Sequence, residues 1–352
     1  MLRRISPRPS PPAGRRGRPV AGACALLVCA LLLCSRPASP QTPQKIKITM
    51  PVVALSMLPV YLAKANGYFT EAGVDVEMIV TSGAGPDVKA LISGDVDFSF
   101  TPGDNVMLAY QEGKRVVIVM NGFRRLLINW AMRSDVARAR GITASTPLAD
   151  KIKALKGLTI GVTQPGALTA HLAAFVVRRA GFVPQQDVTI VPVGAGPTWL
   201  AALENHKVDV ALTATPVPET AISQGYAMMF IDNAKGEDPS IPEFLMECLI
   251  TRPDVVQKNP DLVRRMARAL VRANVWALRH QPQEIADAVK PFLGQTPPAV
   301  LLAGVVSTLP ALSRDGRATE RSVQVTQDVL EQAGILKTRP AYAAVVDNDF
   351  LR

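Results

Sequence analysis

Short apolar runs alternate with amphipathic stretches along most of the chain from residue 45 onward. The runs have the length and spacing of strands, and the stretches between them carry apolar residues at helical spacing. Strands are predicted at 45–50, 74–80, 96–100, 116–120, 127–132, 158–162, 188–193, 208–213 and 243–251. Helices are predicted at 58–66, 86–93, 104–111, 169–180 and 198–204, with another opening at Pro216. This alternation predicts an α/β protein with mostly parallel sheets.

An internal repeat divides this pattern into two similar units. The segment IVTSGAGP at 79–86 recurs as IVPVGAGP at 190–197. An Ala-Leu pair and then a Val-Asp pair follow each copy, and the strand-like runs 45–50 and 157–162 stand at corresponding positions before them. The chain is therefore predicted to form two similar α/β lobes, with one site between them.

The chain is expected to cross between the lobes twice, near 130 and near 240. Two crossovers form a hinge, and hinged lobes can close on a ligand. This assigns residues 45–130 and 241–345 to lobe I and residues 131–240 to lobe II. The C-terminal part is predicted to be helical, at 261–280, 283–292, 298–309 and 319–332. Residues 134–147 are expected to form a polar loop, and residues 339–352 to be loosely ordered.

Positive charge is concentrated at the N-terminus. Residues 1–40 contain seven arginines and no acidic residue, which accounts for most of the formal net charge of +10. The apolar run at 20–34 is too short to span a bilayer, so residues 1–40 are predicted to be an export signal. An uncleaved N-terminal anchor and a lipid anchor on Cys34 are the alternatives. The rest of the chain is nearly neutral, which argues against nucleic-acid binding.

Candidate ligand-binding residues follow from the predicted topology, because parallel α/β sheets bind ligands beyond the carboxyl ends of their strands. Six loops meet this condition, and their glycines and helix N-termini can offer backbone N–H groups to a polar or anionic ligand. The alternative is that these glycines only form tight turns. The predicted ligand-binding residues are Ala54, Ser56, Met57, Ser82, Gly83, Thr101, Gln164, Gly166, Thr169, Gly196, Trp199 and Thr215.

The sequence offers little support for catalysis. It contains no nucleophile, phosphate-binding or dinucleotide-binding motif and no His/Cys/Asp cluster with metal-ligand spacing, so no catalytic residue, metal or cofactor is predicted. His171 is expected to be an exposed helical residue, and Cys248 a buried apolar one. Asp97 and Asp209 match across the repeat and are expected to have structural roles. The pair at 124–125 is either an anion-binding arginine pair in the cleft or a solvated surface pair.

Five phrases carry a resemblance to a known family: PVYLAKANGYF at 59–69, GVDVE at 73–77, ALISGDVDF at 90–98, LKGLTIG at 155–161 and VDVA at 208–211. They resemble the substrate-binding proteins of ABC importers for nitrate, sulfonates, taurine and thiamine-precursor pyrimidines. The resemblance implies a type II periplasmic-binding-protein fold and a ligand in the cleft. The six candidate loops contain no Lys or Arg. A sulfonate or nitrate would therefore depend on backbone N–H groups, hydroxyls or the arginines at 124–125, and a neutral heterocycle or a carboxylate fits equally well.

The expected function is that of a solute-binding protein in the periplasm, delivering a small polar organic ligand to an ABC permease and its ATPase subunit. The family resemblance implies a monomer that meets the membrane only through the permease or a lipid anchor. Two alternatives remain, namely an enzyme on the same fold acting on a small heterocycle and a ligand-sensing partner of a membrane receptor.

Overall fold

The structure is a computed structural model that describes residue 10 and residues 43–81, 83–194 and 198–352. The predicted export signal, Ser82 and Gly196 therefore lie outside the described residues. In the part of the chain that is described, no helix is long and apolar enough to cross a membrane.

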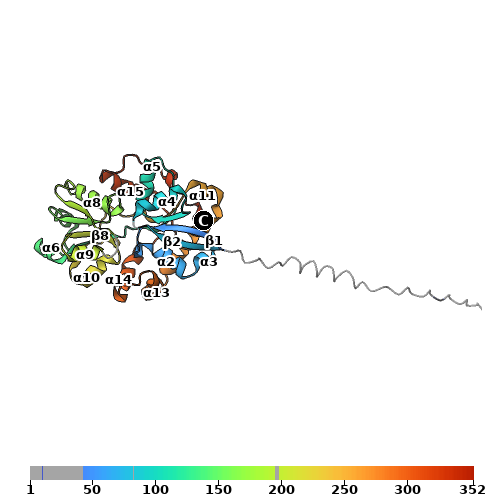
Figure 1. Cartoon of the computed structure of the whole chain (residues 1–352), viewed down its shortest axis with the longest axis horizontal. Helices are drawn as coiled ribbons and strands as arrows, with labels where there is room; N and C mark the ends of the chain where they lie inside the picture. The colour runs from blue at the N-terminus through green and yellow to red at the C-terminus, as the bar shows by residue number, and fades with distance from the viewer. Residues whose placement is uncertain (1–9, 11–42, 82, 195–197) are drawn as a thin grey trace, which may run out of the picture. The chain divides into compact units, whose positions relative to one another are not determined.

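Two five-stranded sheets organise the body of the protein (Figure 1). The first contains β1 (Gln44–Met50), β2 (Val74–Val80), β3 (Phe98–Thr101), β4 (Val117–Phe123) and β10 (Met246–Thr251), in the order β2-β1-β3-β10-β4. The second contains β5 (Ile128–Arg133), β6 (Thr159–Val162), β7 (Thr189–Pro192), β8 (Val210–Ala214) and β9 (Ala227–Ile231), in the order β7-β6-β8-β5-β9. In each sheet the fourth strand is antiparallel to both neighbours.

The antiparallel strands are exchanged between the lobes. Strand β5 follows β4 in the chain but pairs in the second sheet, and β10 follows β9 but pairs in the first. The connections at residues 124–127 and 232–245 are the two crossovers that the sequence predicts. The lobe boundaries given above stay a prediction.

Helices cover both sheets. Figure 1 shows α4 (Ala84–Ser93) and α5 (Asp104–Gln111) on one side of β1 and β2, and α2 (Leu58–Ala65) and α3 (Tyr68–Glu71) on the other. The remaining helices are η1 (Leu55–Met57), α6 (Ser134–Ala139), α7 (Leu148–Lys153), α8 (Leu168–Arg179), α9 (Thr198–Glu204), α10 (Val217–Ser223), α11 (Pro253–Lys258), α12 (Pro260–Ala277), α13 (Pro282–Val289), η2 (Lys290–Phe292), α14 (Pro298–Thr308), η3 (Leu309–Ala311), α15 (Glu320–Gln332), α16 (Tyr342–Val345) and η4 (Asp349–Leu351).

Three local predictions need correction. Helix α6 occupies part of the segment predicted as a polar loop, where Ala137 is buried against the second lobe. Strand β9 is absent from the predicted strands, although it completes the second sheet by pairing with β5. Residues 339–352 are not loosely ordered, because Val345, Val346 and Phe350 are buried and the Asp347 N–H donates to the Ile118 carbonyl at 2.9 Å.

The repeat in the sequence is also a repeat in structure. Ile46 pairs with Val76 in the first sheet as Ile160 pairs with Ile190 in the second. The Asp97 carboxylate accepts the Lys47 N–H at 3.0 Å, and the Asp209 carboxylate accepts the Thr159 N–H at 2.8 Å. Each aspartate thus ties the start of one strand to its neighbour, which confirms the structural role that we predict for them.

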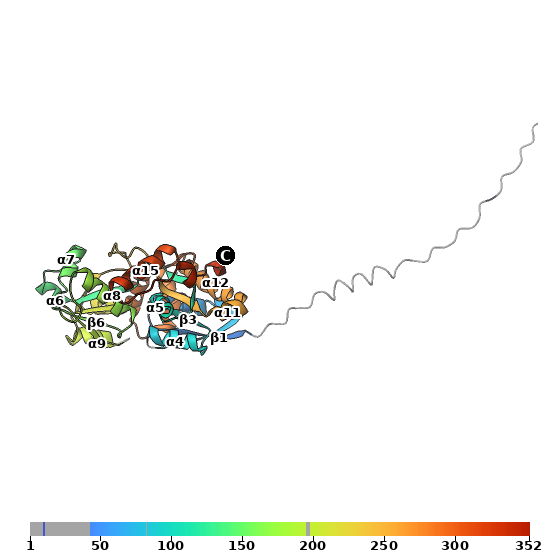
Figure 2. The same cartoon turned by 90° about the horizontal axis from the view of Figure 1, so that it is seen from above.

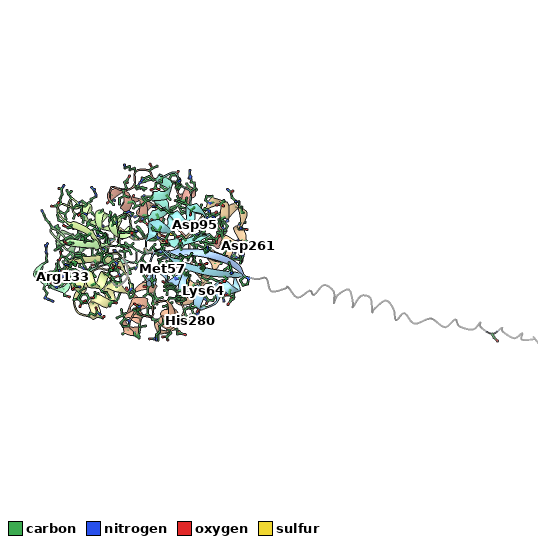
Figure 3. All side chains as sticks on the ribbon, viewed as in Figure 1. Met57, Lys64, Asp95, Arg133, Asp261 and His280 are labelled. Atoms are coloured by element: carbon green, nitrogen blue, oxygen red, sulfur yellow. The ribbon has the colours of Figure 1, made fainter. Side chains whose placement is uncertain are left out.

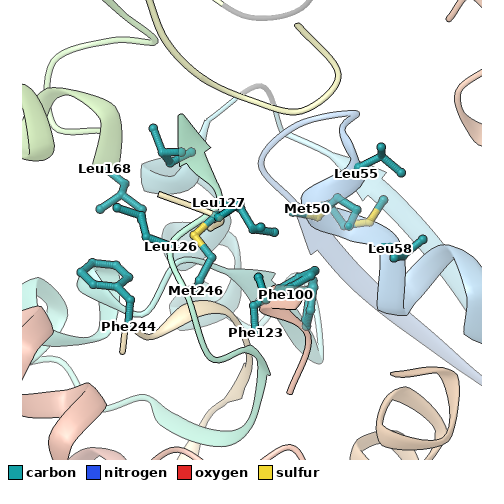
Figure 4. Packing of buried hydrophobic residues seen from close by; sticks show 14 of the residues in the cluster. Met50, Leu55, Leu58, Phe100, Phe123, Leu126, Leu127, Leu168, Phe244 and Met246 are labelled. Carbon is teal, nitrogen blue, oxygen red and sulfur yellow. The ribbon is translucent and has the colours of Figure 1, made fainter. Parts of the chain in front are cut away.

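One hydrophobic core runs through both lobes and the first crossover. Leu126 and Leu127 are almost completely buried, and Figure 4 shows Leu126 beside Leu168 of the second lobe and Leu127 above Met246 of the first. The first crossover is therefore packed into the apolar core through these two leucines.

Phe350→Ala tests whether the C-terminal segment belongs to this fold. Phe350 is 5% exposed, and removal of a buried Phe side chain costs about 3–5 kcal/mol. We expect urea denaturation to show a loss of that order in the free energy of unfolding. Arg352→Ala, at an exposed position two residues further on, should leave it unchanged. Equal stability of Phe350→Ala and the parent would mean that the segment does not contribute.

Candidate ligand-binding site

A cavity of about 730 Å³, measured to its open mouth, lies between the two lobes. Segments that follow the carboxyl ends of β1, β3, β6 and β8 form most of its wall. The exchanged strands β5 and β10 contribute one residue each, Ile128 and Glu247. Lobe I contributes Pro51, Val52, Val53, Ala54, Ser56, Gly83, Pro102 and Glu247. The second lobe and the first crossover strand contribute Ile128, Thr163, Ala167, Leu168, Thr169, Trp199, Thr213, Ala214, Pro216 and Val217.

Five of the predicted ligand-binding residues line this cavity. They come from both lobes and from different parts of the repeat, and they are Ala54, Ser56, Gly83, Thr169 and Trp199. Thr169 also organises its own loop, because its hydroxyl oxygen accepts the Thr163 N–H at 2.9 Å. Ser82 and Gly196 are not described, so their places relative to the cavity stay predictions.

The other predicted residues lie near the cavity or apart from it. Met57 is buried in the core, near the middle of the body in Figure 3. Thr101 is buried beside Asp87, and the Thr215 hydroxyl donates to Glu219 at 3.1 Å. The Gln164 amide lies against Gly83, so closely that a Cβ at position 83 would overlap it. Gly166 lines a separate pocket beside His171.

Trp199 reaches the cavity because Gly161 leaves room for it. A Cβ on Gly161 would lie 2.8 Å from the Val193 side chain and 3.1 Å from the Trp199 ring. The indole is 2% exposed and packs over β6 as well as lining the cavity. It can therefore offer a flat apolar wall to a ligand while remaining part of the core.

Direct contacts join the lobes on both sides of the cavity. The Leu55 N–H of the first lobe donates to the Thr215 carbonyl of the second at 3.0 Å. The His171 Nδ1 lies 2.8 Å from the Asp104 carboxylate, with both side chains buried. His171 is therefore not the exposed residue that its helical position suggested. Helix α15 packs against α8 beside this pair (Figure 2).

Glu247 is the functional candidate that sequence reasoning missed. It lies on β10, lines the cavity and is 2% exposed. Its Oε2 is buried and has no hydrogen-bond partner among the described residues. Burial raises the pKa of Glu247 well above its ordinary value, the nearby Ser56 hydroxyl lowers it, and Asp87 and Asp104 raise it further. The signal available in the sequence was a single acidic residue inside an apolar strand, FLMECLIT at 244–251.

Asp87 is a second buried carboxyl of the first lobe. The side chain is fully buried, and its Oδ1 accepts a hydrogen bond from the Thr81 hydroxyl. Burial raises the pKa of Asp87 to about 7, although the hydrogen bond from Thr81 and the nearby Thr101 hydroxyl favour the ionised form. Desolvation penalises the charged carboxylate, so it is the larger effect here.

The comparisons with known proteins decide the family. A sequence profile described as "NMT1/THI5 like" matches residues 55–285. The chain belongs to the NMT1/THI5-like family. The riboflavin-binding protein RibY of Chloroflexus aurantiacus is 26% identical over 275 residues, which cover 73% of this chain and 69% of RibY.

Solved structures share the fold of this NMT1/THI5-like chain. A protein from Bordetella bronchiseptica RB50 has a TM-score of 0.74 and 23% identity, covering 87% of this chain and 95% of that one. The periplasmic aliphatic sulphonate binding protein SsuA from Escherichia coli has a TM-score of 0.66 and 15% identity, covering 87% of this chain and 93% of SsuA. These likenesses confirm the two-lobed periplasmic-binding-protein fold that we predict.

The described cavity lining of this NMT1/THI5-like protein contains no Lys, Arg or His. Arg124 lines a different pocket together with Arg314 and Arg317, and the Arg125 guanidinium donates to the Lys235 carbonyl at 3.2 Å. The structure therefore does not bring these two arginines into the cleft. No group of three or more His, Cys, Asp or Glu suited to a metal ion occurs within residues 43–81, 83–194 and 198–352. Cys248 is buried, as predicted.

Asp87→Asn should change the pH dependence of stability. A folded-state pKa near 7, against a usual value of 3.8, means that the protonated form is stabilised by the fold. That contribution is complete below about pH 4 and is lost as the pH rises through 7, a difference of about 4 kcal/mol. We expect the free energy of unfolding of the parent to fall relative to Asp87→Asn between pH 5 and pH 8. Asp95→Asn, at an exposed site, should follow the parent; parallel curves for Asp87→Asn and the parent would contradict the assignment.

His171→Ala should favour separation of the lobes, because it removes the partner of a buried carboxylate in the opposite lobe. The Asp104 Oδ1 keeps the Asn105 N–H as its donor, but water can reach the Oδ2 that loses His171 only if the lobes move apart. We expect small-angle X-ray scattering of the ligand-free protein to give a larger radius of gyration than the parent. His206→Ala serves as the control, since His206 is exposed and its neighbour Asp135 belongs to the same lobe. The same radius of gyration in His171→Ala and the parent would show that the pair does not hold the lobes.

Proposed function

We propose that this chain is the solute-binding component of an ABC importer and acts in the periplasm. It captures a small polar organic ligand between its lobes and presents the closed form to a membrane permease with its ATPase subunit. The observation that carries this proposal is a cavity whose walls come from both lobes, at the carboxyl ends of strands in two sheets joined by two crossovers. The relatives SsuA, a sulphonate-binding protein, and RibY, a riboflavin-binding protein, support a binding role.

Closure of the lobes explains how such a protein would signal occupancy. The Leu55–Thr215 hydrogen bond and the Asp104–His171 contact exist only when the lobes meet. A ligand that touches both lobes binds the closed form more tightly than the open form and therefore shifts the equilibrium toward closure. A permease that recognises the closed form would then bind the loaded protein preferentially.

The lining of the cavity favours an organic ligand. The walls are mostly apolar, with Trp199 on one side and hydroxyl groups of Ser56, Thr163 and Thr169 on others. Nitrate or a sulfonate would meet a carboxyl group there and, among the described lining residues, no cationic side chain.

An enzyme on the same fold is the rival function. Glu247 is the one ionisable side chain among the described residues that line the cavity. General acid–base and nucleophilic mechanisms ordinarily combine at least two such groups within hydrogen-bond reach. The site therefore supports binding better than catalysis.

Thermal unfolding of the chain without residues 1–40 tests the proposal against a panel of amines, N-heterocycles, carboxylates, sulfonates and nitrate. A ligand at one hundred times its dissociation constant adds about 2.7 kcal/mol of stability, so a true ligand should give a clear rise in the midpoint. It should also decrease the radius of gyration measured by small-angle X-ray scattering.

Two serine variants test whether the ligand binds in this cavity. Ser56→Ala removes a cavity hydroxyl that has no partner among the described residues, so it should reduce the midpoint shift without harming the fold. Ser93→Ala, on the exposed end of α4, should keep the full shift. If no panel member shifts the midpoint and denaturing extraction releases no small molecule, the binding role is refuted.

A further inference from the structure

Glu247 makes no interaction that would account for a buried acid in the fold. It takes part in no ion pair among the described residues, and no described donor pairs with its buried Oε2. Its neighbours are two further carboxyl groups, Asp87 and Asp104, which make its position less favourable. A buried carboxyl without a partner costs free energy, so the fold alone gives no reason for an acid here.

The backbone of Glu247 adds to this cost. Its φ angle is +51°, in the left-handed region that non-glycine residues seldom adopt. The other described non-glycine residues with positive φ, Gln185 and His206, lie on exposed surface, whereas Glu247 is buried in a strand. Strain of this kind is concentrated at sites where a side chain must point in a required direction. The direction here is into the cavity.

Close packing of β4 against β10 stabilises this backbone conformation of Glu247. A Cβ on Gly122 would lie 2.7 Å from the Glu247 carbonyl oxygen and 2.7 Å from the Phe100 ring. The absence of a side chain on Gly122 therefore lets β4 approach β10 closely at this residue. The flanking residues of β10 stay in register, with Met246 opposite Phe123 and Cys248 opposite Asn121.

We propose that Glu247 selects the ligand by accepting a hydrogen bond from an N–H group, so that the solute is an amine or an N–H-bearing organic molecule. The inference rests on the solute-binding function proposed above and names the chemistry of the same site. An N–H donor supplies the partner that the carboxyl lacks. A hydrogen bond to the carboxylate also favours the ionised form over the neutral acid, and such a bond is stronger than one between neutral groups. Trp199 and the apolar walls then contact the rest of the ligand.

The same arrangement rejects anions. An anionic ligand beside Glu247 would be repelled by each of the three nearby carboxyl groups, counting Asp87 and Asp104, that is ionised, inside a cavity where charge interactions are poorly screened. No lysine, arginine or histidine among the described lining residues offsets that repulsion. Binding of nitrate or a simple sulfonate is therefore disfavoured at this site.

A thermodynamic cycle that combines the substitution Glu247→Gln with removal of the ligand's N–H tests the proposal. Each ligand found with the panel is compared with its fully N-methylated analogue, a quaternary ammonium in the case of an amine, in which no N–H remains. The comparison is made by isothermal titration calorimetry on the parent and on Glu247→Gln. In the parent we expect N-methylation to weaken binding roughly tenfold to a hundredfold. In Glu247→Gln the N–H-bearing ligand itself should bind weakly, and N-methylation should matter much less, because the amide presents an N–H of its own.

Glu243→Gln is the matched control, because Glu243 is the same residue type four positions earlier and lines a different pocket. It should reproduce the parent in every arm, and Glu247→Asp provides a second variant if the amide does not fold. Equal effects of N-methylation on the parent and on Glu247→Gln would overturn the proposal. Tight binding of nitrate or methanesulfonate, with no N–H-bearing ligand, would also overturn it while leaving the solute-binding function intact. A panel without any ligand, together with a denaturing extraction that releases no small molecule, refutes both.

Discussion

The exchange of one strand between the lobes is the constraint on which the rest of the structure depends. Each sheet is complete only when β5 or β10 enters it from the opposite lobe. In the first connecting segment, Leu126 and Leu127 lie inside a core that extends through both lobes. The lobes therefore cannot separate without unpairing central strands, and their freedom is limited to bending at the two crossovers. This limit keeps the strand ends that surround the cavity opposite one another.

Much of this architecture could be predicted from local patterns. Strands and helices have different apolar spacings, and the repeat specified which segments correspond, so the paired roles of Asp97 and Asp209 could be inferred from the amino-acid sequence. The errors arose where long-range contacts decide the outcome. Residues 339–352 lie at the end of the chain, where loose order is common, but they are ordered by packing against β4. His171 has an ordinary helical position, and only the approach of the opposite lobe buries it.

The candidate site was also predictable only where local pattern and topology determine it. Reasoning from strand ends led to Ala54, Ser56, Gly83, Thr169 and Trp199, because topology alone brings those loops together. It could not find Glu247, which lies within a strand and reaches the cavity through an unusual backbone angle. Glu247 stands out in the sequence because its neighbours are apolar. The orientation of its side chain, however, depends on how closely β4 and β10 approach at Gly122. The arginines at 124–125 were candidates for the cleft because they lie near a crossover in sequence, but they do not line the cavity.

The contact between Leu55 and Thr215 is made by main-chain atoms, through an N–H and a carbonyl. Side-chain replacement leaves both groups in place, so this part of the closing movement does not depend on which residues line the cavity. In the binding role that we propose, a change of solute through residues such as Glu247 or Trp199 would therefore leave this main-chain contact available for closure. The Asp104–His171 contact, by contrast, depends on its side chains.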